Sequence, residues 1–331
     1  MCGCTGAARW ARTARATLCA LLLAGSMGLS GCALTTPTRA EVEPERAQAT
    51  LTGEDLVREG VLTVAVDAED APQVMDGAEG GHTGYYIDIA RAIAERQGLD
   101  IAVVSSTDTE DALADGGADI YIGHCVSEDE DLVVTSPILD NASAVFGRVE
   151  GDGASLSADD LSGSVVAVQS GSASQDALAK AGVAAELKEC SNVNACFDAL
   201  DSGEADYVAC DATAGAYLAR AYPGVGFVCS ASDATSFGIA LPEGAADVAS
   251  QVRATFDELL EEGVIEALHR QWYGSLPLSL ADTLLAGVSL SEADDEEESG
   301  AEETGSSTSS SSQGTGASSG LSISGNLNAL D

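Results

Sequence analysis

The sequence predicts an α/β protein with two lobes. Short apolar segments alternate with helical or turn segments, as in VLTVAV at 61–66 and SVVAVQ at 164–169. Continuous apolar runs of this kind are typical of parallel strands that are covered by helices on both faces. A second observation is an internal repeat, because residues 111–122 and 198–209 share one pattern of helix end, glycine and strand. Two copies of one unit favour two similar lobes over a single sheet.

The individual elements follow from local patterns. In YIDIARAIAERQG, Ile89 and Ile93 lie four residues apart and Gly98 follows, which predicts a helix that ends there. Other strands are predicted in IAVVSS (101–106), ADIYIG (118–123), ADYVAC (205–210) and GFVCS (226–230). Near the end of the predicted fold, apolar residues recur at helical spacing on both sides of Gly263, and we interpret them as core packing. They are Val252, Phe256, Leu259, Leu260, Ile265, Leu268 and Trp272.

Residues 1–31 predict a lipoprotein signal peptide. Three arginines precede the apolar run ATLCALLLAGSMGL, which is too short to span a bilayer as a helix. The run ends in Leu29-Ser-Gly-Cys32, which resembles the lipobox of bacterial lipoproteins and implies that Cys32 is acylated. An ordinary secretory signal with an incidental cysteine is the alternative. We therefore expect an exported protein that lipid anchors to the outer face of the cell membrane.

The two ends of the exported chain differ in composition from its centre. Residues 32–50 are polar with scattered prolines and are interpreted as a tether. Residues 276–331 contain EADDEEESGAEE and a Ser/Gly/Thr tract, and such composition cannot bury enough apolar surface to offset the entropy of ordering. We expect this tail to be disordered and the folded region to span residues 51–275.

The formal net charge of −40 excludes nucleic acid as a partner and disfavours an anionic membrane surface. A small-molecule ligand remains, and we expect a monomer. Cysteine and histidine spacing predicts neither a metal site nor a bound cofactor. Cys190 and Cys196, in CSNVNAC, are the nearest cysteine pair of the folded region and are a possible disulfide.

Several segments in order resemble the extracellular solute-binding proteins of polar amino-acid ABC importers, which have the type II periplasmic-binding-protein fold. The motif Leu-x-x-Gly-x-x-Asp occurs in both predicted lobes. The other matching segments are Gly84–Ala94, with Tyr86 where the family has an acid, Val165–Ser172, Phe237–Pro242 and Leu259–Gly274.

The resemblance implies a ligand cleft between two lobes that close on the ligand by hinge motion. Lobe 1 would comprise residues 51–143 and 238–275, and lobe 2 with its hinges residues 144–237. The hinge strands would lie around Ala144–Arg148 and Phe237–Leu241. The implied function is the binding of a small polar solute and its delivery to a membrane permease, without catalysis. The alternatives are a sensor or adhesion module without transport, and a dehydratase-like enzyme on the same fold.

In lobe 2, the resemblance implies that Asp211 holds the amine of an amino acid. Capping of the following helix is the alternative for this residue. Gly171, Ser172 and Ser174 match the turn that binds the carboxylate at a helix N-terminus, although Ala173 stands where the family has a hydroxyl.

In lobe 1, Asp70 lies in the segment where the family has an aromatic clamp, and Tyr85 and Tyr86 are candidate substitutes, with Tyr85 equally a core candidate. Asp88 is expected to cap its own helix rather than to bind ligand.

The lobe 1 binding loop is acidic. It reads GHCVSEDEDLVVTSPIL and contributes the candidates Gly123, His124, Cys125 and Ser127. No Arg occurs between Arg96 and Arg148, so the arginine that binds the carboxylate in the family has no counterpart here. Either the acids of the loop point to solvent, or the ligand carries more positive charge than a plain amino acid.

Overall fold

The computed structural model describes residues 51, 56–77, 80–126, 133–149, 157–241 and 246–286. The signal peptide, Cys32, the tether and the chain beyond residue 286 lie outside these ranges, so their interpretation stays a prediction. Within the described ranges, none of the helices has the length and apolar character of a membrane span.

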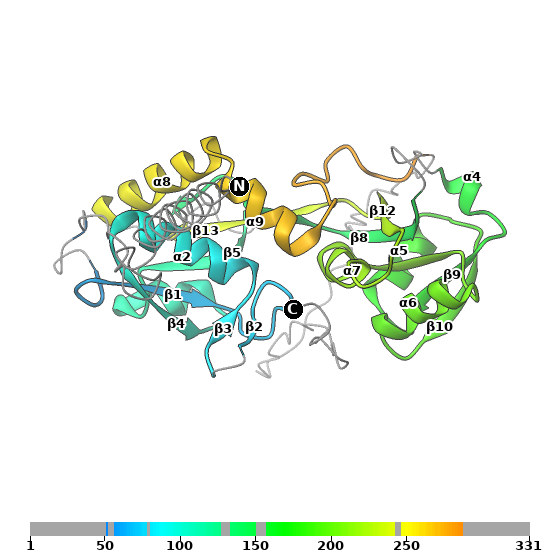
Figure 1. The fold of residues 1–331 in the computed structure, drawn as a ribbon, viewed down its shortest axis with the longest axis horizontal. Coiled ribbons are helices and arrows are strands. Elements are labelled where there is room, and N and C mark those ends of the chain that lie inside the picture. Colours follow the sequence, from blue (N-terminus) through cyan, green and yellow to red (C-terminus); the bar gives the residue numbers. More distant parts are fainter. Residues whose placement is uncertain are drawn as a thin grey trace, which may run out of the picture. The chain divides into compact units, whose positions relative to one another are not determined.

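Lobe 1 is built on a sheet with the strand order β4-β1-β5-β13-β6, and β7 also pairs with β13 (Figure 1). The strands are β1 (Val61–Val66), β4 (Asp100–Ser105), β5 (Ile120–Cys125), β6 (Val133–Val134), β7 (Leu139–Asn141) and β13 (Thr235–Leu241). β1 pairs in parallel with β4 and β5, whereas β13 is antiparallel to β5. The helical elements are α2 (Tyr85–Gln97), α3 (Thr109–Leu113), η1 (Ala114–Gly116), α8 (Ala246–Glu261) and α9 (Val264–Tyr273). A short hairpin is formed by β2 (Met75–Asp76) and β3 (His82–Thr83).

Lobe 2 repeats this plan, with the strand order β10-β9-β11-β8-β12. Its strands are β8 (Ser143–Arg148), β9 (Val165–Gln169), β10 (Glu186–Cys190), β11 (Tyr207–Asp211) and β12 (Val225–Ser230). Three parallel strands are again followed by an antiparallel strand that arrives from the other lobe. The helices are α4 (Ala158–Leu161), α5 (Ala173–Lys180), α6 (Val193–Ser202) and α7 (Ala212–Ala219). The predicted strands and the helix that ends before Gly98 are confirmed.

The internal repeat has a structural cause. The aspartate of Leu-x-x-Gly-x-x-Asp precedes β5 in lobe 1 and β11 in lobe 2, and in both it accepts from the backbone of the neighbouring parallel strand. Asp119 accepts from Thr63 N at 2.6 Å, and Asp206 accepts from Val165 N at 2.9 Å. Each carboxylate satisfies a donor at the start of a buried strand, where an unpaired N–H would be costly.

The chain crosses between the lobes earlier than predicted. Ala144–Arg148 lies within β8 of the lobe 2 sheet, and Phe237–Leu241 lies within β13 of the lobe 1 sheet. The crossings fall instead at Ala142, between β7 and β8, and at residues 231–234, between β12 and β13. The resemblance had placed these crossings within the two strands, whereas the sheet pairing puts them in the short breaks just before β8 and β13.

The boundary of the tail at residue 275 was also wrong. Residues 275–286, which we call the crossing segment, leave α9 and run to lobe 2. On the lobe 1 side of the hinge, Asp140 accepts from Leu280 N at 2.9 Å and from Ser279 Oγ at 3.1 Å. On the lobe 2 side, Ser230 exchanges backbone hydrogen bonds with Thr283 and Leu285, each 2.8 Å long. The crossing segment is thus a third connection beside the two hinge crossings.

Burial explains why this part of the tail is ordered. Leu276, Leu280 and Leu285 are 4%, 2% and 2% exposed, and Leu285 packs in the lobe 2 core with Val145 and Leu161. The prediction of disorder was based on the composition of the whole tail, and it overlooked the three leucines at the start of the tail. Their burial provides the apolar contact that the acidic and Ser-rich part lacks.

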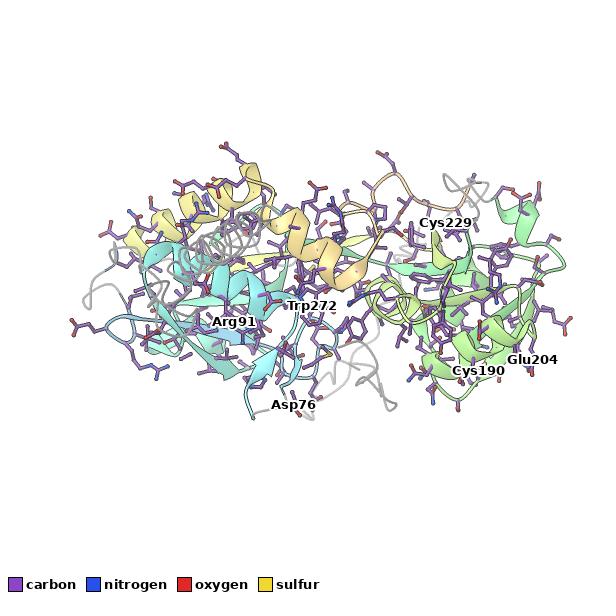
Figure 2. All side chains as sticks on the ribbon, viewed as in Figure 1. Asp76, Arg91, Cys190, Glu204, Cys229 and Trp272 are labelled. Carbon is purple, nitrogen blue, oxygen red and sulfur yellow. The ribbon has the colours of Figure 1, made fainter. Side chains whose placement is uncertain are left out.

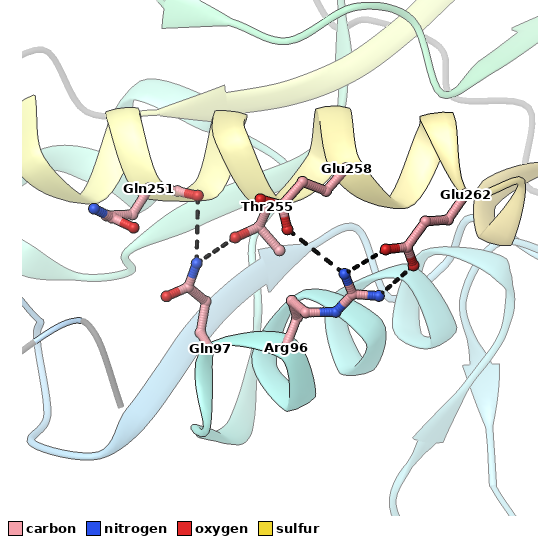
Figure 3. A network of polar contacts seen from close by, with 6 residues as sticks. All are labelled: Arg96, Gln97, Gln251, Thr255, Glu258 and Glu262. Carbon is pink, nitrogen blue, oxygen red and sulfur yellow. Dashed lines mark hydrogen bonds and ion pairs between the residues drawn. The ribbon is translucent and has the colours of Figure 1, made fainter. Parts of the chain in front are cut away.

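Side chains at the end of α2 bind it to α8 (Figure 3). Arg96 contacts both carboxylate oxygens of Glu262, at 3.0 and 2.6 Å, and Gln97 donates to Thr255 Oγ1. The ion pair is exposed and contributes little to stability, whereas the buried amide contact fixes the helix register. This pairing completes one face of lobe 1.

We predict that Leu285→Ala lowers the free energy of unfolding by about 2–5 kcal/mol, because it removes a buried side chain from the lobe 2 core. Chemical denaturation measures the effect. Leu187→Ala is the matched control, since Leu187 is 37% exposed, and its effect should stay within about 0.5 kcal/mol. Equal effects of the two substitutions would contradict the ordered crossing segment.

Candidate ligand-binding site

A cavity of about 150 Å³ lies at the carboxyl ends of the lobe 2 strands. The predicted residues Gly171, Ser172, Ser174 and Asp211 all line it. Its other lining residues are Ser143, Gln169, Ala173, Val193, Ala209 and Cys210. The carboxyl edge of parallel strands is where ligands bind in α/β sheets, because loops and helix N-termini converge there. The lobe 2 half of the predicted site is thus brought together as one concave surface.

Asp211 caps α7 and still faces this cavity. Its Oδ1 accepts from Thr213 N at 3.1 Å, Ala214 N at 2.9 Å and Thr213 Oγ1 at 2.7 Å. Its Oδ2 accepts from the Asn141 side chain, which is in the hinge strand β7. Capping, the alternative considered from the sequence, is therefore present. It does not exclude ligand contact, because Asp211 also lines the cavity and a carboxylate oxygen can accept more than one hydrogen bond.

The turn before α5 is partly saturated by its own contacts. Gly171 N donates to Gln175 Oε1 at 2.7 Å, and Ser172 Oγ caps the helix by accepting from Gln175 N. Ser174 Oγ donates to Ser143 Oγ at 3.2 Å. As the first residues of α5, Ala173 and Ser174 have backbone N–H groups without an intrahelical acceptor. These two donors are the ones available to an anionic group in the cavity.

The lobe 1 side is formed by the loop after β1, and Gly84 determines its position. Gly84 has a φ of 133°, and a Cβ there would lie 2.1 Å from the Gln73 carbonyl oxygen. Only glycine tolerates that approach, which lets Tyr86 N donate to the same oxygen at 3.1 Å. The loop is thereby held against the N-terminus of α2. The Gly-aromatic signature of the sequence thus serves to place Gln73.

A chain of hydrogen bonds joins the two lobes through Gln73. Its Nε2 donates to Asp70 Oδ1 at 3.2 Å and to Thr213 Oγ1 of lobe 2 at 3.3 Å. The Thr213 hydroxyl in turn donates to Asp211. The side chains of Asp70, Gln73, Thr213 and Asp211 therefore form one continuous polar path from lobe 1 to lobe 2, with Asn141 of the hinge at its end.

The electrostatics of this path are unfavourable for its own carboxylates. Burial, then the negative charges of Asp211 and Asp67, raise the pKa of Asp70 to about 7. Among the described residues, no ion pair involves Asp67, Asp70 or Asp211. Carboxylates so placed repel one another, and a bound cation relieves that repulsion.

Two buried polar atoms beside the path have no partner. Gln73 is 4% exposed and its Oε1 accepts no hydrogen bond, while Tyr273 is 1% exposed and its hydroxyl is likewise unpaired. Burial, the phenols of Tyr86 and Tyr85, and the charges of Asp70 and Asp211 raise the pKa of Tyr273. An unsatisfied buried polar group costs about 1–3 kcal/mol, so both atoms favour a ligand or water that completes them.

The two tyrosines predicted as clamp residues belong to the interior of lobe 1. Tyr85 donates to the Ile138 carbonyl at 2.8 Å and packs edge-on against Tyr273. The ligand role considered for Tyr85 is replaced by its core alternative. Tyr86 is 2% exposed, and its ring fills the space beside Gly123, where a Cβ would lie 2.7 Å away.

The binding-loop candidates are only partly described. Gly123, with a φ of 103°, lies at a bulge opposite Gly238 and Ile239 of β13. The bulge places His124 in the interior, where Nδ1 contacts Thr109 Oγ1 at 3.0 Å and Nε2 has no partner. Cys125 is buried. Ser127 and the acids Glu128 to Asp131 lie outside the described residues, so their part in binding stays a prediction.

Asp88 neither caps its helix nor lines the cavity. It accepts from Trp272 Nε1 at 2.8 Å and pairs with Arg91 at 3.0 Å.

Trp272, predicted as core, is only half-buried and stacks on Tyr217 of lobe 2 with ring centroids 6.0 Å apart (Figure 2). The helical spacing located the helix correctly but did not show that its last turn contacts the other lobe.

Cys190 and Cys196 are free thiols in the structure, so the disulfide considered from the sequence is absent from it. Cys196 lies in α6, and burial together with the neighbouring Cys190 thiol raises its pKa. A protonated, buried thiol is a poor nucleophile.

The sequence interpretation did not select Gln73, Asn141, Thr213 or Tyr273. Gln73 lies where the resemblance led us to expect an aromatic clamp, and a glutamine beside Asp70 was a signal of polar character. Thr213 is only two residues from Asp211, in the helix that Asp211 caps, so its place could have been inferred locally. Asn141 and Tyr273 carry no local pattern, because only the fold brings them near Asp211.

Residues 62–151 match the family of bacterial extracellular solute-binding proteins, family 3. An ancestral cationic amino acid solute binding protein superposes with a TM-score of 0.53 and 25% identity, covering 65% of this chain and 96% of that one. Residues 62–151 are thus similar to this family of solute-binding proteins.

Two solved structures of lower identity share the two-lobed type II fold with this chain. One is a polar amino acid ABC uptake transporter substrate binding protein from Streptococcus thermophilus, with a TM-score of 0.60, 18% identity, and coverage of 68% of this chain and 90% of that one. The other is the unliganded, open L-cystine solute receptor of Neisseria gonorrhoeae, with a TM-score of 0.55, 20% identity, and coverage of 66% and 95%.

We predict that Asp70→Asn stabilises the ligand-free protein increasingly as pH rises from 5 to 8. The pKa of Asp70 is raised from 3.8 to about 7, so the folded state keeps a proton that the unfolded state loses above pH 4. The contribution of the Asp70 carboxyl to the free energy of unfolding therefore falls as pH rises from 5 to 8. Asparagine does not titrate, so the variant avoids this loss. Thermal unfolding at several pH values measures the difference, with the exposed Asp76→Asn as control. A difference that does not change with pH would contradict the assigned environment of Asp70.

Proposed function

We propose that this chain is the exported, lipid-anchored substrate-binding protein of an ABC importer, and that it binds a small amino-acid-like solute that carries positive charge. The observation that supports this most is the path from Asp70 to Asp211, which presents acceptors from both lobes and has no paired cation among the described residues. The similar ancestral structure is that of a cationic amino acid solute binding protein, which points the same way.

The lobe 2 cavity has the chemistry for an amino-acid head group. Asp211 is placed to accept from an ammonium, and the free N–H groups of Ala173 and Ser174 are placed to donate to a carboxylate. The two arginines of α2 do not supply a second contact to the ligand carboxylate, since Arg91 pairs with Asp88 and Arg96 with Glu262. The head group is therefore held mainly by lobe 2, and net positive charge in the ligand offsets the surrounding acids.

Binding without turnover is part of the proposal. The described site offers acceptors and backbone donors, and the protein's task would be to close on the solute and present it to a membrane permease. Closure uses the two crossings at Ala142 and residues 231–234. The Gln73–Thr213 bridge is the first contact that such closure would form or tighten.

We predict that L-lysine and L-arginine raise the unfolding temperature in proportion to the logarithm of their concentration, whereas L-glutamate does not. A ligand at 100 times its Kd adds about 2.7 kcal/mol to stability. No response to amino acids or amines of any charge would contradict the proposed function.

Asp211→Asn should weaken binding of L-lysine by about tenfold, because it replaces a charge-assisted bond with a neutral one. The variant should fold normally, since Asn caps helices as well as Asp does. Calorimetric titration measures the change, with Asp257→Asn, at an exposed position of α8, as control. Unchanged affinity would show that Asp211 only caps α7.

We predict that Cys32→Ser abolishes labelling of the full chain by a palmitate analogue and moves the protein from the membrane fraction to the medium. The resemblance of residues 29–32 to a lipobox is the basis. An unlabelled wild-type protein would instead support the ordinary secretory signal.

A further inference from the structure

We propose that Asp70, Gln73 and Tyr273 form a second cation subsite, separate from Asp211, and that Asp70 makes the protein select solutes with two positive groups. The inference rests on the proposed function and specifies it further. It would make the far end of the solute, rather than its amino-acid head, the part that decides specificity.

The first observation is geometric. Asp70 Oδ1 lies 3.2 Å from Gln73 Nε2, and the same nitrogen lies 3.3 Å from Thr213 Oγ1. Both amide protons of Gln73 are therefore used, one toward each lobe. The Gln73 carboxamide is held in one orientation, and its oxygen has no donor. A fixed, empty acceptor next to a carboxyl group matches a ligand group that only donates, such as an ammonium or a guanidinium.

The second observation is the unpaired Tyr273 hydroxyl. Tyr273 is 1% exposed, and the charges of both Asp70 and Asp211 contribute to its raised pKa after burial and the neighbouring phenols. A phenol can accept from a cation or donate to the Asp70 carboxylate. Thus Gln73 and Tyr273, from a loop and from α9, are two independent buried side chains with an open hydrogen-bonding position at one acid.

Within the described ranges, the charged groups that act on Asp70 are both negative. Asp67 is in the same loop, and Asp211 starts α7 of lobe 2. Tyr86 of α2, Tyr121 of β5 and Tyr273 of α9 each have a raised pKa to which burial contributes most and the charge of Asp70 adds. Ionised Asp70 is therefore without a counter-ion until a ligand supplies one.

The proton of Asp70 follows from this arrangement. A carboxyl group with a pKa of about 7 holds its proton in the empty site at acid pH. When a second cationic group binds, the carboxyl O–H bond breaks, the proton passes to a solvent water, and the carboxylate pairs with the cation. Only the ionised fraction binds well, so apparent affinity for a doubly cationic solute rises on the order of 100-fold from pH 5 to pH 8 and then levels.

Titration of the full-length protein with L-lysine and L-norleucine tests the subsite, because the two differ only by the terminal ammonium. L-lysine should bind more tightly, and its advantage should grow from pH 5 to pH 8. Asp70→Asn should remove both the preference for L-lysine over L-norleucine and its pH dependence. Asp76→Asn, on the exposed β2–β3 hairpin (Figure 2), is the control that should change neither. If Asp70→Asn perturbs the circular dichroism spectrum, Asp70→Ser replaces it.

The outcomes separate this inference from the proposed function. Equal binding of L-lysine and L-norleucine, or a lysine preference that survives in Asp70→Asn, overturns the subsite and leaves the solute-binding function intact. A third arm uses putrescine, which has two ammonium groups and no carboxylate. If putrescine alone binds, with the same pH dependence, the subsite stands and the amino-acid head is wrong. No binding of any of the three overturns both.

Discussion

The hydrogen-bond path from Asp70 through Gln73 and Thr213 to Asp211 is the interaction on which the site depends. It is the point at which polar side chains of the two lobes meet, and Asn141 extends it into a hinge strand. Each side chain on the path either is a hydrogen-bond acceptor or already donates its protons to an acceptor of the path. A site built this way in a partly dehydrated cleft favours a cation, because the attraction of opposite charges strengthens as water is excluded and the repulsion among the acids is relieved.

The fold supplies this path by using one structural plan twice. Three parallel strands in each lobe direct their carboxyl ends to the site, and a fourth, antiparallel strand comes across from the other lobe. The crossing segment 275–286 adds a third connection, tied to Asp140 on one side of the hinge and to Ser230 on the other. Since it runs beside both hinge crossings, it restrains the directions in which the lobes can rotate. The Trp272–Tyr217 stack makes a further contact between α9 and α7.

Local patterns predicted the helices and strands well, because apolar runs, helical spacing and the repeated Leu-x-x-Gly-x-x-Asp motif depend only on residues that are close in the sequence. Asp211 and the turn Gly171–Ser174 could be selected for the same reason. Hinge positions, the ordered start of the tail and the distant partners of Asp211 could not, since they depend on contacts between residues far apart in the sequence. Trp272 is an example of what local patterns cannot predict. Its spacing fits the buried face of a helix, but its indole N–H donates to Asp88 and its ring stacks on Tyr217 of lobe 2. Asp70 was selected from its segment alone, and its unusual environment became visible only with Asp211 opposite it.

The central claim is that the site is an acid-lined cleft in which Asp70 exchanges a proton for a ligand cation. Calorimetric titration of the wild-type protein with L-lysine, in buffers of different ionisation enthalpy, counts the protons released on binding. The account predicts about one proton per ligand at pH 6, where Asp70 is still protonated, and close to none at pH 8.5. Tight binding without proton release at pH 6 would contradict it.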